Sequence, residues 1–199
     1  DFMPDGALPT HNGFEVVSVI NRLIDQFDLV VATQDWHPPD HGSFASNHEG
    51  GEVGEVIDLD GLDQIMWPDH CVQNSEGAEF VDELHIEAVD EVFRKGTDPE
   101  IDSYSGFYDN GHRKATGLGD FLHEQGVERI HVAGVATDYC VKFTVLDGRN
   151  QLDLETWVVL DGCRGVGSAA DDIDRAYGEM RLAGAKLIES GVLAAHQTE

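Results

Sequence analysis

The stretch RIHVAGVATDYCVKFTVLDGRNQ, residues 129–151, places an apolar run directly before a helical pattern. Residues 129–136 predict a buried strand, and residues 137–151 predict a helix capped at its start by Thr137 or Asp138. Buried strands that alternate with helices form a parallel sheet with helices on both faces. This stretch therefore indicates an α/β fold.

The rest of the chain continues the same alternation. Helices are predicted over residues 12–27, 77–85, 116–126 and 168–184, and strands over residues 28–35, 88–96, 154–162 and 185–190. Gly126 is expected to close the third of these helices. Residues 36–68 show no clear period apart from a short strand or hairpin near 51–59, and loops of that length tend to be functional. No linker or repeat divides the 199 residues, so one domain is expected.

The charge balance is strongly acidic, with 39 Asp and Glu residues against 12 Lys and Arg residues and a net charge of −27. Such a surface repels nucleic acid and anionic membranes, so neither is an expected partner. Because the acids are spread between apolar periodic segments, a folded protein is expected, and adaptation to high salt is favoured over an ordinary acidic cytosolic protein. No apolar run approaches the roughly 20 residues of a membrane span, and a cytoplasmic location is the default expectation.

The three cysteines are Cys71, Cys140 and Cys163, an odd number with no CxxC pair, which disfavours a disulfide framework or a cysteine-based zinc site. Cys140 falls in the first turn of the predicted helix, where the helix N-terminus would lower the pKa of the thiol. Backbone N–H groups there could also hold an oxyanion. A nucleophile and a small buried hydrophobic residue are both open for Cys140, whereas the buried state is expected for the other two.

The stretch TQDWHPPDHGSF, residues 33–44, sets Asp35 and His37 two positions apart just beyond a predicted strand. In an extended chain these side chains point to the same side and could share a metal ion, with His70 as a third ligand. Two histidines and one carboxylate suit Zn²⁺, or Fe or Mn, although plain surface histidines are the alternative. Lys95 ends another predicted strand and would favour a nearby thiolate, unless it is an ordinary surface lysine.

The segments DFMPDGALP, TQDWHPPDHGSF, WPDHCVQNSEGAEF, RKG, YSGF and GVATDYCVKFT follow one another in a familiar order and spacing. In them the sequence resembles nicotinamidases (pyrazinamidases) of the isochorismatase-like hydrolase superfamily, over nearly its whole length. The resemblance implies one domain over residues 1–199, with a doubly wound, mostly parallel sheet of six strands in the order 3-2-1-4-5-6 and helices on both faces. It also implies metal-assisted hydrolysis of nicotinamide, and of pyrazinamide, to the acid and ammonia in NAD salvage.

The same resemblance implies a role for each matching residue. Cys140 is the expected nucleophile and Lys95 the catalytic lysine. One divalent metal ion, with Zn²⁺ favoured over Fe or Mn, is expected on Asp35, His37 and His70. Ser43 is expected to reach this ion through a water molecule. His41 is a rival for that position, but an exposed histidine is the preferred interpretation.

A cis peptide bond is expected between Val135 and Ala136, with the N–H groups of Ala136 and Cys140 as the oxyanion hole. The residues expected to line the substrate pocket are Phe2, Trp67, Tyr104 and Val135. Nicotinamide is the expected small-molecule partner, and the chain could form a homo-oligomer.

The opening residues Asp1 and Phe2 match the end of the family pattern V-D-x-Q-x-D-F. The family's catalytic aspartate and its first strand are therefore expected upstream of Asp1, and Asp1 itself is expected to be structural. The alternatives are an amidase of the same superfamily that acts on another small amide, and a catalytically inactive relative that binds a metal or a partner. A vinyl-ether hydrolase is disfavoured, because that chemistry needs no cysteine nucleophile.

Overall fold

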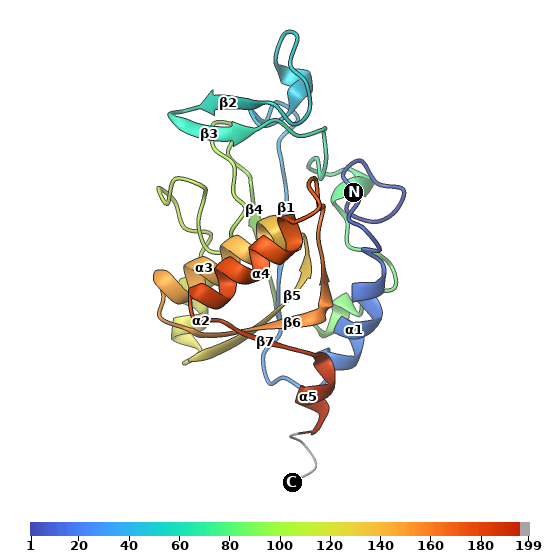
Figure 1. The fold of residues 1–199 in the computed structure, drawn as a ribbon, viewed down its shortest axis with the longest axis vertical. Coiled ribbons are helices and arrows are strands. Elements are labelled where there is room, and N and C mark those ends of the chain that lie inside the picture. The colour runs from blue at the N-terminus through green and yellow to red at the C-terminus, as the bar shows by residue number, and fades with distance from the viewer. Residues whose placement is uncertain (196–199) are drawn as a thin grey trace.

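The computed structural model describes residues 1–195, and its parallel strands and helices form an α/β fold (Figure 1). The strand β1 (Val31–Asp35) pairs in parallel with β4 (Glu91–Lys95). A second parallel sheet joins β5 (Arg129–Val135), β6 (Glu155–Arg164) and β7 (Lys186–Ile188) in that order. When strand 1 is left out of the expected order 3-2-1-4-5-6, the groups 3-2 and 4-5-6 remain. The observed groups β4-β1 and β5-β6-β7 agree with these two groups. The full order of six strands stays a prediction, since the described residues form five parallel strands in two sheets.

Helices cover both faces of the larger sheet because neighbouring residues of β6 point to opposite sides. Val158 packs into a cluster with the helices α3 (Lys142–Asn150) and α4 (Asp172–Leu182). The next residue, Val159, packs against α1 (Glu15–Ile24) on the other face. Both valines are at most 1% exposed, so the sheet is the buried middle layer of three.

The remaining elements are short. Helix α2 (Leu118–Glu124) is followed by Gly126 in the left-handed conformation, as predicted (φ 70°). Helix α5 (Ser190–Ala195) follows β7. The strands β2 (Val56–Leu59) and β3 (Leu62–Ile65) form an antiparallel hairpin that projects from the body of the molecule (Figure 1).

The predicted helix over residues 77–85 is wrong. Only single 3₁₀ turns form, at Glu76–Ala78 and Ile86–Ala88, because distant groups take the backbone atoms that a helix would use. Asn21 donates to the carbonyl of Glu83 and accepts from the N–H of His85, and Gln34 donates to the carbonyl of Ala78. Tertiary hydrogen bonds thus override the local helical pattern.

The expected helix cap after β5 is also wrong. Residues Thr137–Val141 form a π-helical turn, and α3 begins only at Lys142. The Asp138 carboxylate does not cap this helix but accepts hydrogen bonds from the N–H groups of Val166 and Gly167, at 3.0 and 2.9 Å. Asp138 therefore ties the turn after β5 to the loop after β6.

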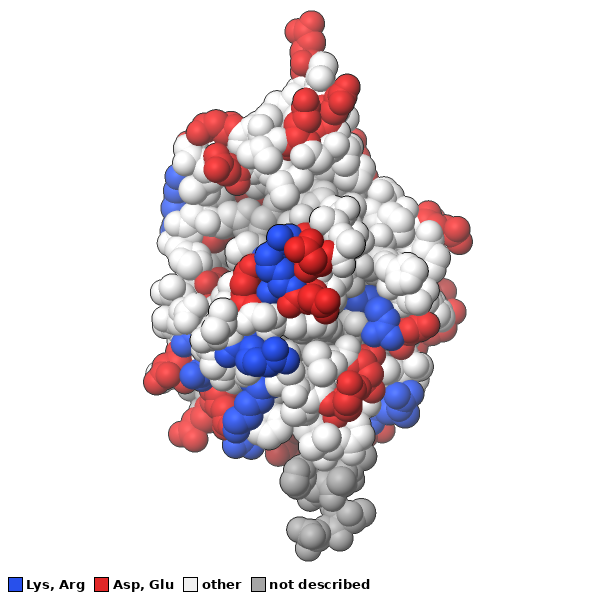
Figure 2. Space-filling view, in the orientation of Figure 1, with Lys and Arg blue, Asp and Glu red and all other residues white. Residues whose placement is uncertain are grey.

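Acidic residues are distributed over the visible face of the molecule, with fewer Lys and Arg residues between them (Figure 2). This pattern agrees with charges spread along the whole chain rather than gathered in one acidic patch. Adaptation to high salt stays a prediction. Among the described residues, no helix is both long and apolar enough to cross a membrane.

Replacement of Met180 by alanine is expected to lower the free energy of unfolding by about 2–5 kcal/mol, because it opens a cavity in the cluster between α3, α4 and β6. Urea denaturation monitored by circular dichroism measures this change. Leu182→Ala is the matched control on the same helix, since Leu182 is 91% exposed and should change stability by less than about 0.5 kcal/mol. Equal losses in the two variants would contradict this description of the core.

Candidate active site

The carboxyl ends of β1 and β4 and the turn after β5 bring Asp35, Lys95 and Cys140 together. The parallel register pairs Asp35 with Lys95 directly, and Lys95 Nζ lies 2.5 Å from Asp35 Oδ1. The same amine donates to the carbonyl of Ser103 at 2.7 Å and to Cys140 Sγ at 3.4 Å. An ammonium group has three protons, and Asp35, Ser103 and Cys140 provide one acceptor for each of them in this buried position.

The ion pair between Asp35 and Lys95 holds both groups in their charged forms. Burial alone lowers the pKa of Lys95, but the carboxylate of Asp35 and the nearby Cys140 outweigh it, so the pKa is raised. Burial likewise raises the pKa of Asp35, but the Lys95 ammonium outweighs it and the pKa is lowered. The site therefore contains a buried, compensated pair of charges.

The thiol of Cys140 does not have the lowered pKa that its position suggests. Burial raises its pKa to about 11, and the Lys95 ammonium and a backbone hydrogen bond from Ala136 offset only part of that rise. The prediction that the helix N-terminus lowers this pKa is wrong. The free-energy cost of removing a thiolate from water exceeds the stabilisation that Lys95 and Ala136 provide. Cys140 is thus a thiol at neutral pH and needs a base to become a nucleophile.

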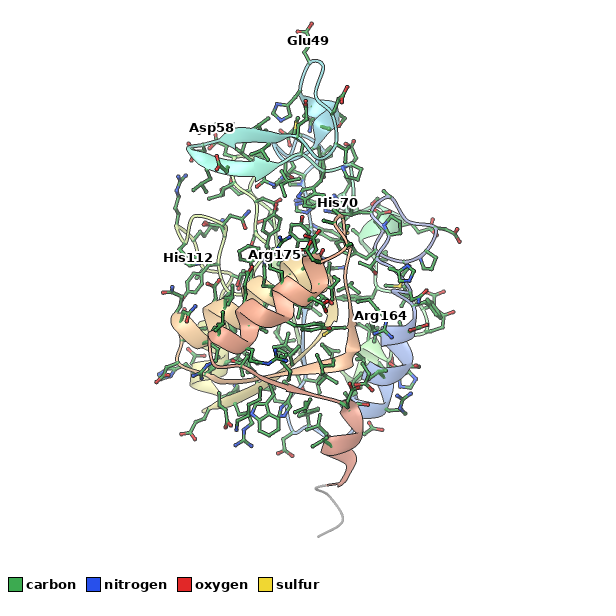
Figure 3. The ribbon with its side chains drawn as sticks, viewed as in Figure 1. Glu49, Asp58, His70, His112, Arg164 and Arg175 are labelled. Atoms are coloured by element: carbon green, nitrogen blue, oxygen red, sulfur yellow. The ribbon has the colours of Figure 1, made fainter. Side chains whose placement is uncertain are left out.

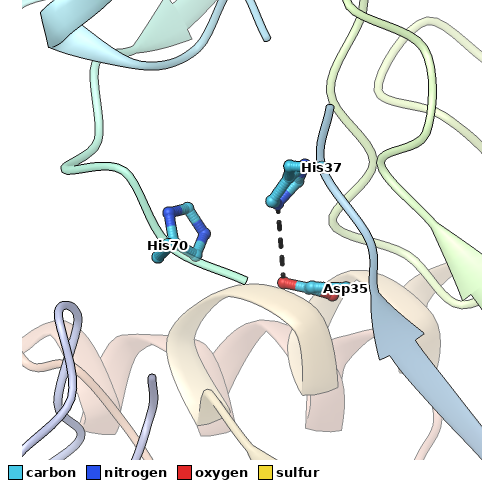
Figure 4. A group of neighbouring side chains, drawn as sticks. All are labelled: Asp35, His37 and His70. Atoms are coloured by element: carbon cyan, nitrogen blue, oxygen red, sulfur yellow. Dashed lines mark ion pairs between the residues drawn. The ribbon is translucent and has the colours of Figure 1, made fainter. Parts of the chain in front are cut away.

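Asp35, His37 and His70 form a group whose ligand atoms lie within 4.8 Å of one another (Figure 4). His37 Nε2 is 3.9 Å from Asp35 Oδ2. His37 Nδ1 contacts the carbonyl of Gly96 at 2.9 Å, and His70 Nδ1 contacts that of Pro68 at 2.8 Å. A carbonyl only accepts, so each Nδ1 carries the proton and each Nε2 keeps a lone pair for a metal ion.

The charge states of these two histidines also suit a metal. Burial lowers the pKa of His37 and of His70, which keeps both imidazoles neutral. Neutral imidazole is the form that binds metal ions, and two imidazoles with one carboxylate suit Zn²⁺, Fe or Mn. The residues therefore fit a single divalent cation, with Asp35 shared between the ion and Lys95.

The interpretation of His41 as an exposed residue is wrong, because its side chain is fully buried at 0% exposure. Its ring packs against those of His37 and Phe44, and burial lowers its pKa to about 4. Ser43 is also buried, and its hydroxyl contacts His41 Nδ1 at 2.7 Å rather than pointing at the ligands of the first group. A second group, His37, His41 and Asp102, again has its ligand atoms within 4.8 Å.

A pocket with a largely aromatic and aliphatic wall opens beside Cys140. Three of the four predicted lining residues are in place: Phe2, Trp67 and Tyr104. Val135 is not among the lining residues, but its neighbour Ala136 is, and the bond between them is cis. The Trp67 indole donates to the Tyr104 hydroxyl at 3.1 Å, which fixes these two side chains.

Sequence reasoning missed several residues of this pocket, namely Leu8, Asp102, Ser103, Tyr139 and Val166. Two of them could have been proposed from their positions in the sequence. Tyr139 directly precedes Cys140, and Asp102 stands two positions before the YSGF segment. Leu8 and Val166 lie on loops whose approach to the site only the folded chain reveals.

The model of the isochorismatase domain family matches residues 1–191. The chain belongs to this family. It is 51% identical to a nicotinamidase of Escherichia coli (strain K12) over 191 residues, which cover 94% of this chain and 89% of the relative.

Solved structures of the isochorismatase-domain family resemble this one closely. A nicotinamidase and pyrazinamidase of Acinetobacter baumannii superposes with a TM-score of 0.92 at 40% identity, covering 96% of this chain and 92% of that one. A pyrazinamidase of Pyrococcus horikoshii in complex with zinc superposes with a TM-score of 0.74 at 36% identity, covering 94% and 92%. The fold of the isochorismatase domain is therefore shared over nearly the whole chain.

Lys95→Met is expected to raise the pKa of the Cys140 thiol further, because the variant loses the ammonium that favours the thiolate and leaves the Asp35 carboxylate unopposed. The pH dependence of Cys140 alkylation by iodoacetamide, followed by peptide mass spectrometry, measures this shift. The wild-type rate should rise toward pH of about 11, and the variant rate should rise only at higher pH. An unchanged or lowered midpoint would show that Lys95 does not act on the thiol.

Proposed function

We propose that this isochorismatase-domain protein hydrolyses nicotinamide, and also pyrazinamide, to the carboxylic acid and ammonia. The observation that carries this proposal is the contact of 3.4 Å between Cys140 Sγ and Lys95 Nζ beside a pocket that also contains the Asp35, His37 and His70 group. A flat heteroaromatic amide suits such a pocket, since aromatic walls stack on the ring while polar groups fix its ends. The names of the Escherichia coli and Acinetobacter baumannii relatives support the same substrate.

The proposed reaction proceeds through a thioester. Cys140 gives its proton to a carboxylate, and the thiolate attacks the carboxamide carbon. The C–N bond breaks as the nitrogen receives that proton, and ammonia leaves. Water then attacks the thioester, the C–S bond breaks, and Cys140 regains its proton as the acid is released. The raised pKa of the thiol makes the proton acceptor an essential part of this scheme.

Lys95 and the turn after β5 supply the electrostatic part of the proposal. The Lys95 ammonium steadies the thiolate, and the N–H groups of Ala136 and Cys140 receive the negative charge that develops on the amide oxygen. Support comes from the backbone hydrogen bond by which Ala136 lowers the pKa of Cys140. Asp35, His37 and His70 would hold one divalent ion, with Zn²⁺ favoured as in the Pyrococcus horikoshii complex. A bound ion would supply a Lewis-acid position for the ring nitrogen.

The proton acceptor is proposed to be an aspartate on a further strand. Asp35 is an unsuitable base, because Lys95 already holds its carboxylate at 2.5 Å in a charged pair. Among residues 1–195, β1 and β5 each pair with one strand only, so each keeps one open edge. A strand that pairs with both edges would complete the expected order and bring a carboxylate to the carboxyl ends where Cys140 and Lys95 lie.

Cys140→Ala is expected to reduce ammonia release from nicotinamide at least about a thousandfold, because no other group can form the thioester. Zinc content by elemental analysis should stay unchanged, since Cys140 does not belong to the group of Asp35, His37 and His70. Cys163→Ala is the matched control, because that cysteine lies in the core beside α4 and should retain turnover. Full activity in Cys140→Ala would end the proposal. Wild-type protein that releases no ammonia would instead indicate another amide substrate or an inactive relative.

Removal of the metal ion with 1,10-phenanthroline is expected to lower kcat/KM for nicotinamide at least about tenfold, because the ring loses the group that orients it. Added Zn²⁺ should restore the activity. The isomer 1,7-phenanthroline, which does not chelate, is the control. If protein shown by elemental analysis to be metal-free keeps its full kcat/KM, the metal has no part in catalysis.

A further inference from the structure

Asp138 joins two segments that each carry part of the pocket wall. It is 5% exposed and lies in the turn Thr137–Val141, two positions before Cys140. Its carboxylate accepts hydrogen bonds from the N–H groups of Val166 at 3.0 Å and Gly167 at 2.9 Å. Cys140 lines the pocket from the turn, and Val166 lines it from the loop after β6. One carboxylate therefore connects the two segments.

The loop after β6 has a backbone shape that suits a carboxylate. The N–H groups of Val166 and Gly167 follow each other in the chain, and Gly167 has a φ of 62°, in the left-handed region that favours glycine. Successive N–H groups in such a turn form a concave site for an anion. Hydrogen bonds from an N–H group to a charged carboxylate are also stronger than those between neutral groups. The Asp138 carboxylate occupies this site.

Close packing at Gly165 adds to these hydrogen bonds. A Cβ atom on Gly165 would lie 2.7 Å from Asp138 Oδ1 and would also collide with Ile173 Cδ1 of α4. Such a distance is far below the roughly 3.5 Å of a normal non-bonded contact. The carboxylate can therefore approach the loop this closely only because Gly165 has no side chain.

The same loop holds the N-terminal segment in place. The carbonyl of Gly165 accepts a hydrogen bond from the N–H of His11 at 3.0 Å. Thr10 is 3% exposed, and its N–H and its hydroxyl both donate to the carbonyl of Phe2, at 2.9 and 3.0 Å. Phe2 and Leu8 line the pocket. A shift of the loop after β6 would therefore move this second part of the wall as well.

We propose that Asp138 is a positioning residue that fixes the width of this pocket, and with it the size of the amide that the pocket admits. Asp138 is not among the residues that line the pocket, so it acts through the wall and not by touching a substrate. Residues 2–11 and 165–167 lie outside every helix and strand. Tertiary hydrogen bonds such as those of Asp138 therefore determine where these segments lie. The kind of substrate rests on the proposed function, but the effect on pocket width is tested without turnover.

The test without turnover compares two alkylating reagents of different size. Cys140 lies in the pocket wall, so a bulky reagent reaches its thiol only when the pocket is wide enough. The rates with iodoacetamide and with the bulkier N-phenyliodoacetamide are measured at one fixed pH by mass spectrometry of the Cys140 peptide. Asp138→Asn replaces one acceptor oxygen by an NH₂ group, which cannot accept from the loop. The rate with the bulky reagent, relative to iodoacetamide, should rise about tenfold as this hydrogen bond is lost.

Three further variants make this comparison specific. Asp171→Asn is the matched control and should keep the wild-type ratio, because this carboxylate is 74% exposed and pairs with Arg175 on α4 (Figure 3). Gly165→Ala leaves the Asp138 carboxylate intact but forces the loop away from it, so the ratio should rise as in Asp138→Asn. Val166→Ala trims the wall directly and gives the ratio of a widened pocket.

Turnover kinetics then separate an effect on the wall from an effect on the thiol. Asp138→Asn and Gly165→Ala should raise KM for nicotinamide about tenfold, because the wall no longer positions the ring. The contact of Cys140 with Lys95 stays, so kcat should change by less than about threefold. The kcat/KM for the larger quinoline-3-carboxamide, relative to nicotinamide, should rise in both variants. A residue that only stabilises the fold would leave this ratio unchanged.

Two results would overturn the inference. One is a wild-type alkylation ratio and KM in folded Asp138→Asn and Gly165→Ala, with folding checked by thermal unfolding. The other is a fall in kcat with KM and the alkylation ratio unchanged, since Asp138 would then act on Cys140 and not on the wall. If Asp138→Asn does not fold, Gly165→Ala decides. Wild-type protein that releases no ammonia would end the proposed function but would leave the alkylation test valid.

Discussion

The buried ion pair between Asp35 and Lys95 is the interaction on which the rest of the site depends. It exists because β1 and β4 pair in parallel with these two residues opposite each other at their carboxyl ends. Neither charge could stay in this environment alone, since an isolated buried charge costs several kcal/mol. Each partner then serves a second group. Lys95 donates to Cys140 Sγ, and Asp35 lies with His37 and His70 in a group that could hold a metal ion. The Cys140 thiol and the group of Asp35, His37 and His70 are thus coupled through one ion pair.

This coupling explains why the thiol is not activated by its surroundings alone. The Lys95 ammonium, which would favour the thiolate, is largely neutralised by the Asp35 carboxylate at 2.5 Å. Burial therefore dominates and raises the pKa of Cys140. A reactive cysteine in such a site depends on a base that removes the proton when substrate is bound, and not on a permanently lowered pKa. The aromatic pocket serves this chemistry, because exclusion of water strengthens every remaining charge interaction.

The sequence predicted the elements that local pattern determines. The α/β class, the helices α1, α2 and α4, and the strands that end at Asp35 and Lys95 follow from periodicity and from turn residues. Local pattern failed where distant groups compete for the backbone. Residues 77–85 look helical, but Asn21 and Gln34 capture their carbonyl and N–H groups. Likewise, Asp138 looks like a helix cap, but its carboxylate binds the loop after β6. Each of these partners lies far away in the sequence, so a local pattern cannot reveal the competition.

The histidines of the candidate site also depend on contacts that local sequence does not reveal, and these contacts set the position of the ring proton. His37 and His41 belong to one short loop, and their side chains are both buried, at 1% and 0% exposure. Their backbone partners are opposite in kind. The carbonyl of Gly96 places the proton of His37 on Nδ1, whereas the N–H of Ser43 places the proton of His41 on Nε2. Nε2 of His37 therefore keeps its lone pair, whereas Nε2 of His41 carries the ring proton. A single backbone contact thus decides which nitrogen of each imidazole carries the proton, and that contact exists only once the loop has folded.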